Sequence, residues 1–173
     1  MKYIANVILI VLGLMTFSAS AGSLYTDVSL VRTTMKIEGE KLNPFLARYK
    51  LGYQITNQLA VEAQLANSAK EDDINNLDVD VDKFTGLYVR YSGDSDYNGV
   101  TMYFIAGSST TKLKWTRNGI SDSETFEDFS YGIGAEERSG SIQNMLYTFE
   151  YIKYYDSNDL DLSGISLGVR YNF

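Results

Sequence analysis

The last nine residues of the chain, 165–173, alternate without a break between apolar and polar or small side chains. One face carries Ile165, Leu167, Val169, Tyr171 and Phe173, and the other carries Ser166, Gly168, Arg170 and Asn172. A period of two is typical of a β-strand whose two faces meet different environments. We interpret this stretch as the closing strand of a transmembrane β-barrel.

Seven earlier segments alternate in the same way over similar lengths. With the last one, the expected strands are residues 23–33, 45–56, 59–69, 84–92, 100–115, 126–137, 142–155 and 162–173. About ten residues is the length that a tilted strand needs to cross a bilayer. The facing of the fifth strand is ambiguous, because residues 102–105 are apolar throughout. The sequence therefore predicts an all-β fold, an eight-stranded antiparallel up-and-down transmembrane β-barrel.

The expected connections alternate long, short, long, medium, long, short and medium. They are residues 34–44, 56–58, 70–83, 93–99, 117–124, 138–141 and 156–161. Outer-membrane barrels have long loops outside the cell and short turns in the periplasm. With an even number of strands, both chain ends fall on the periplasmic side, so we expect the long connections outside.

Residues 1–21 resemble a secretory signal peptide. Lys2 supplies a positive start, residues 4–14 form an apolar run, and residues 19–21 form a small-residue cleavage site. The run is too short to span a bilayer as a helix. We expect residues 22–173 to form a single exported barrel domain, without an appended periplasmic domain, in the outer membrane of a Gram-negative cell.

Alternation alone does not exclude a soluble, lipocalin-like barrel, which would bury its apolar face. Three features favour a membrane barrel. Aromatic residues gather near the strand ends of the apolar face, as interfacial girdles require. The polar face is also rich in glycine, which the inside of a narrow barrel needs more than a wet surface does. These glycines are Gly52, Gly86, Gly132, Gly134, Gly164 and Gly168.

The third feature is a near balance of charge on the polar face. The basic residues are Arg48, Lys50, Arg90 and Arg170, and the acidic residues are Asp27, Glu62, Glu136 and Glu150. Buried charges are tolerated when they are paired and are costly when alone. We therefore predict that these eight side chains form a lumenal ion-pair network.

Three segments resemble the small outer-membrane β-barrel family of Gram-negative bacteria, the OmpA/OmpX-type domain. They are residues 45–65 (FLARYKLGYQITNQLAVEAQL), 129–136 (FSYGIGAE) and 165–173 (ISLGVRYNF). The resemblance implies that Tyr171 and Phe173 belong to the terminal aromatic signal read by the barrel-assembly machinery. It also implies lipid and lipopolysaccharide as neighbours. It indicates little about activity, because this fold carries unrelated functions.

The composition argues against most catalytic chemistry. The chain contains no His, so His-dependent activation of a nucleophile is excluded, and no Cys, so disulfides and a lipid-anchored Cys are excluded. Glu62, Glu136 and Glu150 remain as acid–base candidates if the protein were an enzyme, but we favour an ion-pair role. The acidic mature chain makes a nucleic-acid partner unfavourable. We expect no enzyme activity and no cofactor.

Residues 78–82 (DVDVD) have the carboxylate spacing that opens a calcium loop. The expected glycine is missing, and Val89 stands where the closing Glu belongs. We therefore do not predict a metal site.

The expected outer loops are acidic. Their carboxylates are Glu71, Asp72, Asp73, Asp122, Glu124, Glu127, Asp128, Asp156, Asp159 and Asp161. They favour solubility and calcium-bridged packing beside lipopolysaccharide, or a binding surface for an extracellular protein. We expect a structural or surface-interaction (adhesion-like) role, with the lumen plugged by ion pairs. The alternative is a narrow channel or a transport route for small hydrophobic solutes.

Overall fold

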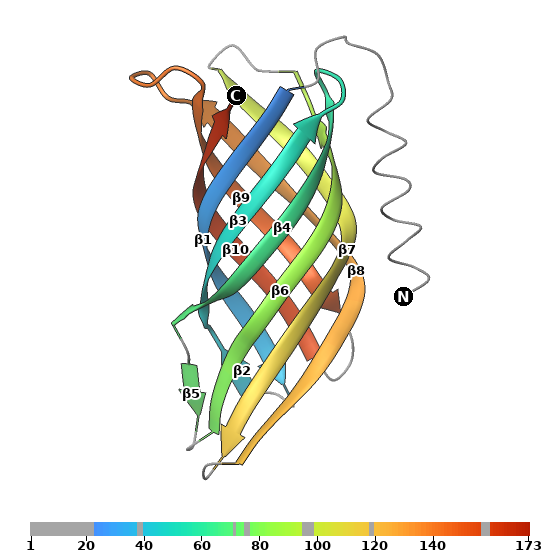
Figure 1. Ribbon diagram of the computed structural model, residues 1–173, viewed down its shortest axis with the longest axis vertical. Helices are drawn as coiled ribbons and strands as arrows, with labels where there is room; N and C mark the ends of the chain where they lie inside the picture. Colours follow the sequence, from blue (N-terminus) through green and yellow to red (C-terminus); the bar gives the residue numbers. More distant parts are fainter. Residues whose placement is uncertain are drawn as a thin grey trace.

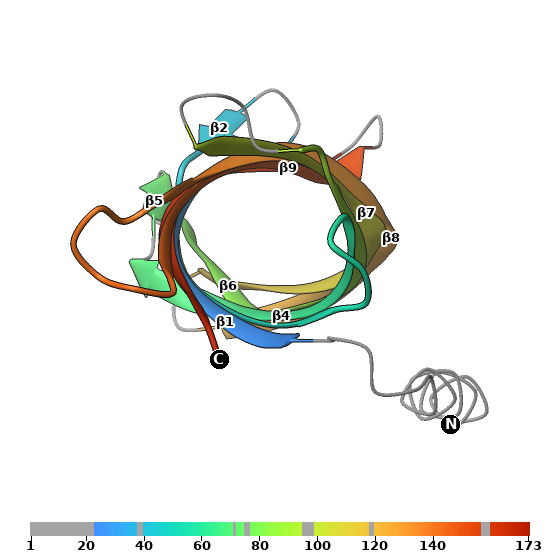
Figure 2. The same ribbon diagram turned by 90° about the horizontal axis from the view of Figure 1, so that it is seen from above.

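A computed structural model of the chain describes residues 23–37, 40–70, 72–74, 77–94, 99–117, 120–156 and 160–173. In these ranges, eight long strands form a closed barrel (Figures 1 and 2). They are β1 (Ser23–Ile37), β3 (Phe45–Gln54), β4 (Leu59–Lys70), β6 (Leu77–Ser92), β7 (Val100–Arg117), β8 (Ile120–Arg138), β9 (Met145–Asp156) and β10 (Leu160–Asn172). Two short strands, β2 (Glu40–Leu42) and β5 (Asp72–Ile74), pair with β1 and β6. The expected signal peptide lies outside the described residues.

Each long strand pairs antiparallel with the next, and β10 pairs with β1 to close the barrel. The closing register runs from Tyr25 opposite Asn172 to Ile37 opposite Leu160. The prediction of an eight-stranded, all-antiparallel, up-and-down barrel is confirmed. Within the described ranges, no helix has the length and apolarity to cross a membrane.

The side chains alternate between lipid-facing and lumenal positions in the predicted sense. Large apolar side chains are exposed around the barrel, for example Leu30 at 62% and Leu167 at 66%, whereas the charged side chain of Arg48 is 2% exposed. The ambiguous residues of β7 follow this rule, because Met102 and Phe104 are exposed while Tyr103 and Ile105 are buried. A soluble barrel would show the reverse pattern. We call the exposed apolar belt the apolar band.

Three predicted connections are wrong, because strands continue through most of each. Residues 34–37 lie in β1 and residues 40–42 form β2. Most of residues 70–83 lie in β5 and in the first part of β6, and residues 120–124 belong to β8. These stretches carry little apolar alternation because their outward side chains, such as Lys36, Lys83 and Ser123, are exposed and polar. Paired strands that lie in water need one apolar face or none. The hydrophobic pattern of the sequence therefore did not reveal these parts of the strands.

The strand ends near the short turns, on the side of the barrel away from these strand continuations, also differ slightly from the prediction. β9 begins at Met145 rather than at residue 142, because residues 139–144 turn and Asn144 has a positive φ of 66°. β3 ends at Gln54, and the Thr56 hydroxyl accepts a hydrogen bond from the Leu59 backbone N–H at 3.0 Å. The same side holds the chain end, since Asn172 N–H donates to Asn144 O and Phe173 N–H to Leu24 O. We call this side the turn end.

At the other side, β6, β7 and β8 reach past the ends of β9 and β10 (Figure 1). Leu87, Ser108 and Phe129 lie level in the register and mark the edge of the apolar band on these strands. The described residues beyond that level, 77–85, 109–117 and 120–128, form what we call the outer extension. It projects from the belt that lipid would cover.

The apolar band makes a prediction about stability in lipid. Leu167→Lys should lower the free energy of unfolding in lipid vesicles by about 2–4 kcal/mol, because it places a charge on the lipid face. Thr110→Lys, on the outward face of the outer extension, should change it by less than about 0.5 kcal/mol. Denaturant titration of both variants gives the comparison. Equal effects of the two substitutions would contradict the assignment of the band.

Candidate functional site

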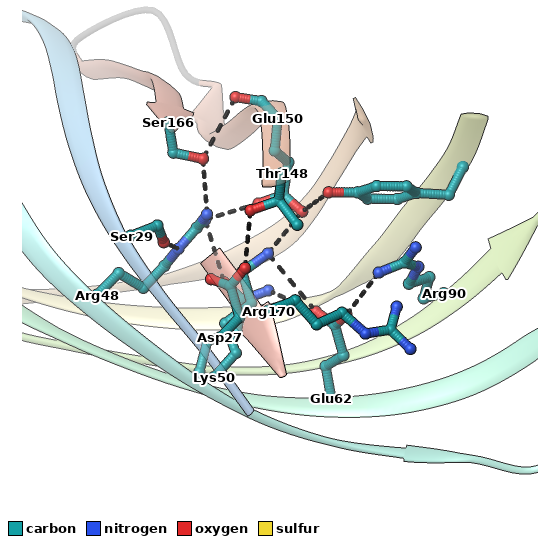
Figure 3. Close-up of polar contacts among 12 residues, drawn as sticks. Asp27, Ser29, Arg48, Lys50, Glu62, Arg90, Thr148, Glu150, Ser166 and Arg170 are labelled. Carbon is teal, nitrogen blue, oxygen red and sulfur yellow. Dashed lines mark hydrogen bonds and ion pairs between the residues drawn. The ribbon is translucent and has the colours of Figure 1, made fainter. Parts of the chain in front are cut away.

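A chain of alternating positive and negative side chains runs through the lumen from the turn end (Figure 3). Arg170 Nη1 lies 2.9 Å and Arg90 Nη2 lies 2.6 Å from the same oxygen of Glu136, Oε2. Arg90 Nη1 then lies 3.6 Å from Glu62 Oε1. These groups come from β10, β8, β6 and β4, so the contacts tie strands across the barrel.

The chain continues through Lys50 on β3. Its Nζ lies 3.9 Å from Glu62 Oε2 and 2.8 Å from Glu150 Oε2. Arg48 Nη1 lies 2.7 Å from the other Glu150 oxygen, Oε1. Every side chain in this chain of contacts is at most 9% exposed. Seven of the eight predicted lumenal charges are therefore brought into contact.

Asp27, the eighth charge, is buried but makes no ion pair with any described residue. Its Oδ2 accepts a hydrogen bond from Thr148 Oγ1 at 2.8 Å, and its Oδ1 has no hydrogen-bond partner in the described part of the chain. In the register Asp27 lies opposite Lys50 on β3 and Arg170 on β10. The carboxylate is thus placed beside two basic positions without direct contact.

Two tyrosines that the sequence analysis did not single out complete the polar layer. Tyr25 donates a hydrogen bond to Glu62 at 2.7 Å, and Tyr103 donates one to Glu150 at 3.0 Å. The Arg170 and Arg90 guanidiniums lie over the rings of Tyr25 and Tyr103, 3.6 and 3.7 Å from the centroids. Cations over tyrosine faces are attracted by the ring quadrupole.

Glycine makes room for each of these rings. Tyr25 lies opposite Gly52, and Tyr103 lies opposite Gly134. A Cβ on Gly52 would overlap Cζ of Tyr25, and a Cβ on Gly134 would overlap Cζ of Tyr103. The inward glycines therefore serve as seats for aromatic rings, which is known as aromatic rescue of glycine. The sequence shows both residue types, but their pairing appears only once the register is known.

A second, apolar layer fills the lumen toward the outer extension. Its buried members include Val31, Met35, Leu42, Leu46, Phe84, Leu113, Ile152, Tyr154 and Leu162. Phe84 and Tyr154 pack edge to face with centroids 4.9 Å apart, and Arg48 donates a hydrogen bond to Tyr154 OH at 3.1 Å. The charges and glycines of the polar face were predicted to fill the lumen, but this apolar layer was not predicted. Leu46 lies on the same face of its strand as Arg48, and Phe84 on the same face as Arg90. This shared facing was the sequence signal that could have predicted the apolar layer.

The turn end of the lumen opens into a polar cleft of about 280 Å³. Its lining includes Gln54, Arg138 and Asn172, and the Glu136–Arg170 pair. Arg170 donates hydrogen bonds to Asn172 Oδ1 at 2.9 Å and to Gln54 Oε1 at 3.4 Å. The cleft is therefore a polar mouth in which Glu136 and Arg170 are already paired with each other.

The outer extension holds four of the acidic residues that the sequence placed in outer loops. Asp122, Glu124 and Glu127 are exposed on β8, and Asp128 is partly buried there. Asp82 pairs with Lys112 at 2.9 Å, and this lysine holds the pKa of the Asp82 carboxyl below its ordinary value.

The remaining acidic positions are either paired or not described. Lys153 Nζ lies 2.8 Å from Asp161 and 3.5 Å from Asp156. Glu71 and Asp159 lie outside the described residues, as do the side chains of Asp72 and Asp73. Among the described side chains, no group of three acidic ligands could hold a metal ion.

The two terminal aromatic residues face away from the lumen. Phe173 is 71% exposed and Tyr171 is 42% exposed, and their rings meet edge to face at 5.4 Å. This places both rings on the outer surface at the turn end.

The family comparison gives one match that spans nearly the whole chain. The model described as "Outer membrane protein beta-barrel domain" matches residues 5–173. A search of curated protein sequences gives no match.

Solved structures share the fold. Ail of Yersinia pestis, described as its attachment invasion locus protein and solved with the heparin analogue sucrose octasulfate, has a TM-score of 0.66 and 21% identity, covering 89% of this chain and 100% of Ail. Neisserial surface protein A has a TM-score of 0.71 and 16% identity, with the same coverage. OprG of Pseudomonas aeruginosa has a TM-score of 0.60 and 11% identity, covering 87% of this chain and 96% of OprG.

The ion contacts predict a large loss when a central carboxylate is removed. Glu150→Gln should destabilise the folded protein by about 3–5 kcal/mol, because it leaves Arg48 and Lys50 buried with less counter-charge. Glu137→Gln, at an exposed position of β8, is the matched control and should cost less than about 0.5 kcal/mol. Unfolding in lipid vesicles measures both. A Glu150→Gln protein as stable as the control would show that these contacts contribute little.

The seating of Tyr103 on Gly134 can be tested by a double-mutant cycle. Gly134→Ala should destabilise the protein by about 1–3 kcal/mol, because the new methyl group overpacks the lumen against the Tyr103 ring. In a Tyr103→Ala background the same change should cost much less, so the two effects should not add. Additive losses would mean that the ring does not depend on the glycine.

Proposed function

The chain belongs to the outer-membrane β-barrel family, and we propose that it is a surface-interaction protein whose closed barrel holds a binding surface outside the cell. The observation that carries this proposal is the contrast between the closed lumen and the outer extension. The lumen is packed with side chains, while three strands extend beyond the apolar band.

Two successive layers argue against conduction through the lumen. The ion-pair layer is closed by contacts between Arg48, Lys50 and Glu150, and the apolar layer is closed by residues such as Phe84 and Leu113. An eight-stranded barrel has just enough interior for side chains. Transport of ions would require both layers to rearrange, and a hydrophobic solute would still meet the buried charges.

We propose that the turn end faces the periplasm and the outer extension faces outward. Short turns on the periplasmic side and longer outer segments are the rule for such barrels. On this orientation Phe173 lies at the periplasmic interface, where the barrel-assembly machinery would read Tyr171 and Phe173. Export would be directed by the signal peptide expected at residues 1–21.

Lipopolysaccharide is the proposed neighbour of the barrel at its outer rim. Lys83 and Lys114 are exposed on the outward face beyond the apolar band, and Lys112, which pairs with Asp82, lies opposite Lys83 on the same face. Ammonium groups at this level would meet the phosphates of the outer leaflet. This contact would anchor the outer extension upright rather than confer a separate activity.

Two structural neighbours that are named for attachment or for the cell surface support the proposal. Their sequence identity to this chain is low, and the feature they share with it is the fold. Ail is described as an attachment invasion locus protein, and another neighbour as a surface protein. We propose no catalytic role, because Glu62, Glu136 and Glu150 are each within 4 Å of two basic side chains, as their distances above show.

Single-channel recording combined with a binding assay tests the proposal. The purified protein in a planar bilayer should show no steady discrete conductance, with a known porin as the positive control. Cells that display the protein should bind cultured animal cells or extracellular matrix more than cells that lack it. Replacing residues 113–124 by an Asn-Gly turn should remove that binding while the barrel remains heat-modifiable on gels.

Steady conductance of the unmodified protein would contradict the closed-frame proposal. Equal binding with and without residues 113–124 would contradict the role of the outer extension.

A further inference from the structure

The polar cleft at the turn end contains one cation that has no partner among the described residues. The guanidinium of Arg138 is exposed in the cleft lining and makes no hydrogen bond or ion pair with the described part of the chain. Glu136 lies on the same face of β8, but its Oε2 already lies 2.9 Å from Arg170 and 2.6 Å from Arg90. Arg138 is therefore a charge that the lumenal ion pairs leave open.

The strand register places Arg138 at the mouth, near a second arginine that is fully used. Leu146 on β9 lies opposite Arg138 on one side and opposite Arg170 on the other. Neighbouring strands are about 4.8 Å apart, so the backbones of the two arginines stand about 10 Å apart with Leu146 between them. All three nitrogens of the Arg170 guanidinium donate hydrogen bonds, as described above. Arg138 is thus the arginine that a ligand can reach.

Other polar groups of the cleft add donors and one acceptor. The side-chain amide of Asn57, in the exposed turn between β3 and β4, makes no hydrogen bond with a described residue. Asn172 accepts from Arg170 through its Oδ1 at 2.9 Å, which leaves its amide N–H groups to donate. Asp94, exposed just after β6, accepts a hydrogen bond from Gln58 at 3.3 Å. The lining therefore suits a ligand that carries a negative charge next to an N–H group.

The size and the position of the cleft limit the ligand. Its volume of about 280 Å³ falls just below the range of sites that take drug-sized molecules, about 300–1,000 Å³. Its walls include the inward-facing ends of β3, β6, β8 and β10, inside the closed ring of strands (Figure 2). Lipid against the outer wall of the barrel does not reach this space. The ligand is therefore a small solute, or the end of a longer chain, that enters from water.

A carboxylate fits Arg138 better than a phosphate does. Two N–H groups of a guanidinium match the two oxygens of a carboxylate in a bidentate pair. A phosphate group carries nearly two negative charges at neutral pH, whereas the described lining offers one open cation and also holds the carboxylate of Asp94. A ligand with an amide N–H beside its carboxylate can bind Arg138 through the carboxylate and donate to Asp94 through the N–H.

We propose that the cleft at the turn end binds the carboxylate of an N-acylated amino acid, or of the carboxyl end of a peptide, with Arg138 as the anchoring cation. The amide groups of Asn57 and Asn172 add neutral donors, and Asp94 selects a ligand with an N–H beside its carboxylate. This site goes beyond the proposed function, because it lies at the end of the barrel opposite the outer extension and needs no passage through the lumen.

Probes that differ in one group test the site. The full protein in lipid nanodiscs is titrated at fixed ionic strength with N-acetylalanine, with N-acetyltrialanine and with N-acetyltrialanine amide. The NMR signals of the arginine side chains are followed, and comparison with Arg138→Lys assigns the signal of Arg138. Both acids should shift that signal in a saturable way, whereas the amide, which lacks the carboxylate, should not. Tighter binding of the tripeptide acid identifies a peptide end as the ligand, and equal or weaker binding identifies the small acid.

Variants of the protein test the anchoring cation, with calorimetry as the measure of binding. Arg138→Gln should weaken binding of the acids at least about tenfold, because charge-assisted hydrogen bonds are lost. Arg138→Lys should fall between this variant and the unmodified protein, since it keeps the charge without the planar fork. Arg32→Gln, at an exposed position on the outward face of β1, is the matched control and should leave binding unchanged. Heat-modifiability on gels verifies that each variant is folded.

Binding of the amide as tight as that of the acids would overturn the proposal, because the carboxylate would then not be recognised. No binding of either acid, or an equal loss in Arg138→Gln and Arg32→Gln, would overturn it as well. So would tighter binding of inorganic phosphate than of N-acetylalanine, since the site would then select charge rather than the shape of a carboxylate. These results are independent of the conductance recording and of the cell-binding assay, so the cleft proposal can fail while the proposed function stands.

Discussion

The pairing of β1 with β10 is the constraint on which the rest of the structure depends. In hydrocarbon each unpaired backbone N–H and C=O costs several kcal/mol, so a sheet that crosses a bilayer must close on itself. The thirteen residue pairs from Tyr25–Asn172 to Ile37–Leu160 complete that closure. Once the sheet is closed, strand alternation separates the side chains into a lipid face and a narrow lumen. The lumen must then be filled with whatever the inward positions carry.

The lumen is filled in two layers of different chemistry. Near the turn end, alternating charges neutralise one another and tyrosine rings seated on glycines pack between them. Toward the outer extension, apolar side chains such as Val31 and Leu46 take over. Arg48 joins the two layers, since it contacts Glu150 in the charged layer and Tyr154 in the apolar layer. This filling closes the lumen with side chains over both layers.

The sequence predicted the parts of this architecture that depend on apolar alternation. The strand count, the up-and-down order and the inward parity of Arg48, Glu62 and Glu150 could be read from the period of two. The extensions of β6 and β8 could not, because polar strands in water carry no such pattern. Tyr25 and Tyr103 were missed for another reason. Their partners, Gly52 and Gly134, become neighbours only through the strand register.

Which face of the sheet meets lipid decides the place of every side chain described above, and one measurement tests it directly. Methyl-labelled protein in nanodiscs, doped with a lipid that carries a nitroxide on its tail, should show broadened methyl resonances for Leu30, Ile133 and Leu167. The methyl resonances of Val31, Leu46 and Ile152, which lie in the lumen, should stay sharp. Broadening of the second set with sparing of the first would mean that the barrel is turned inside out relative to this account.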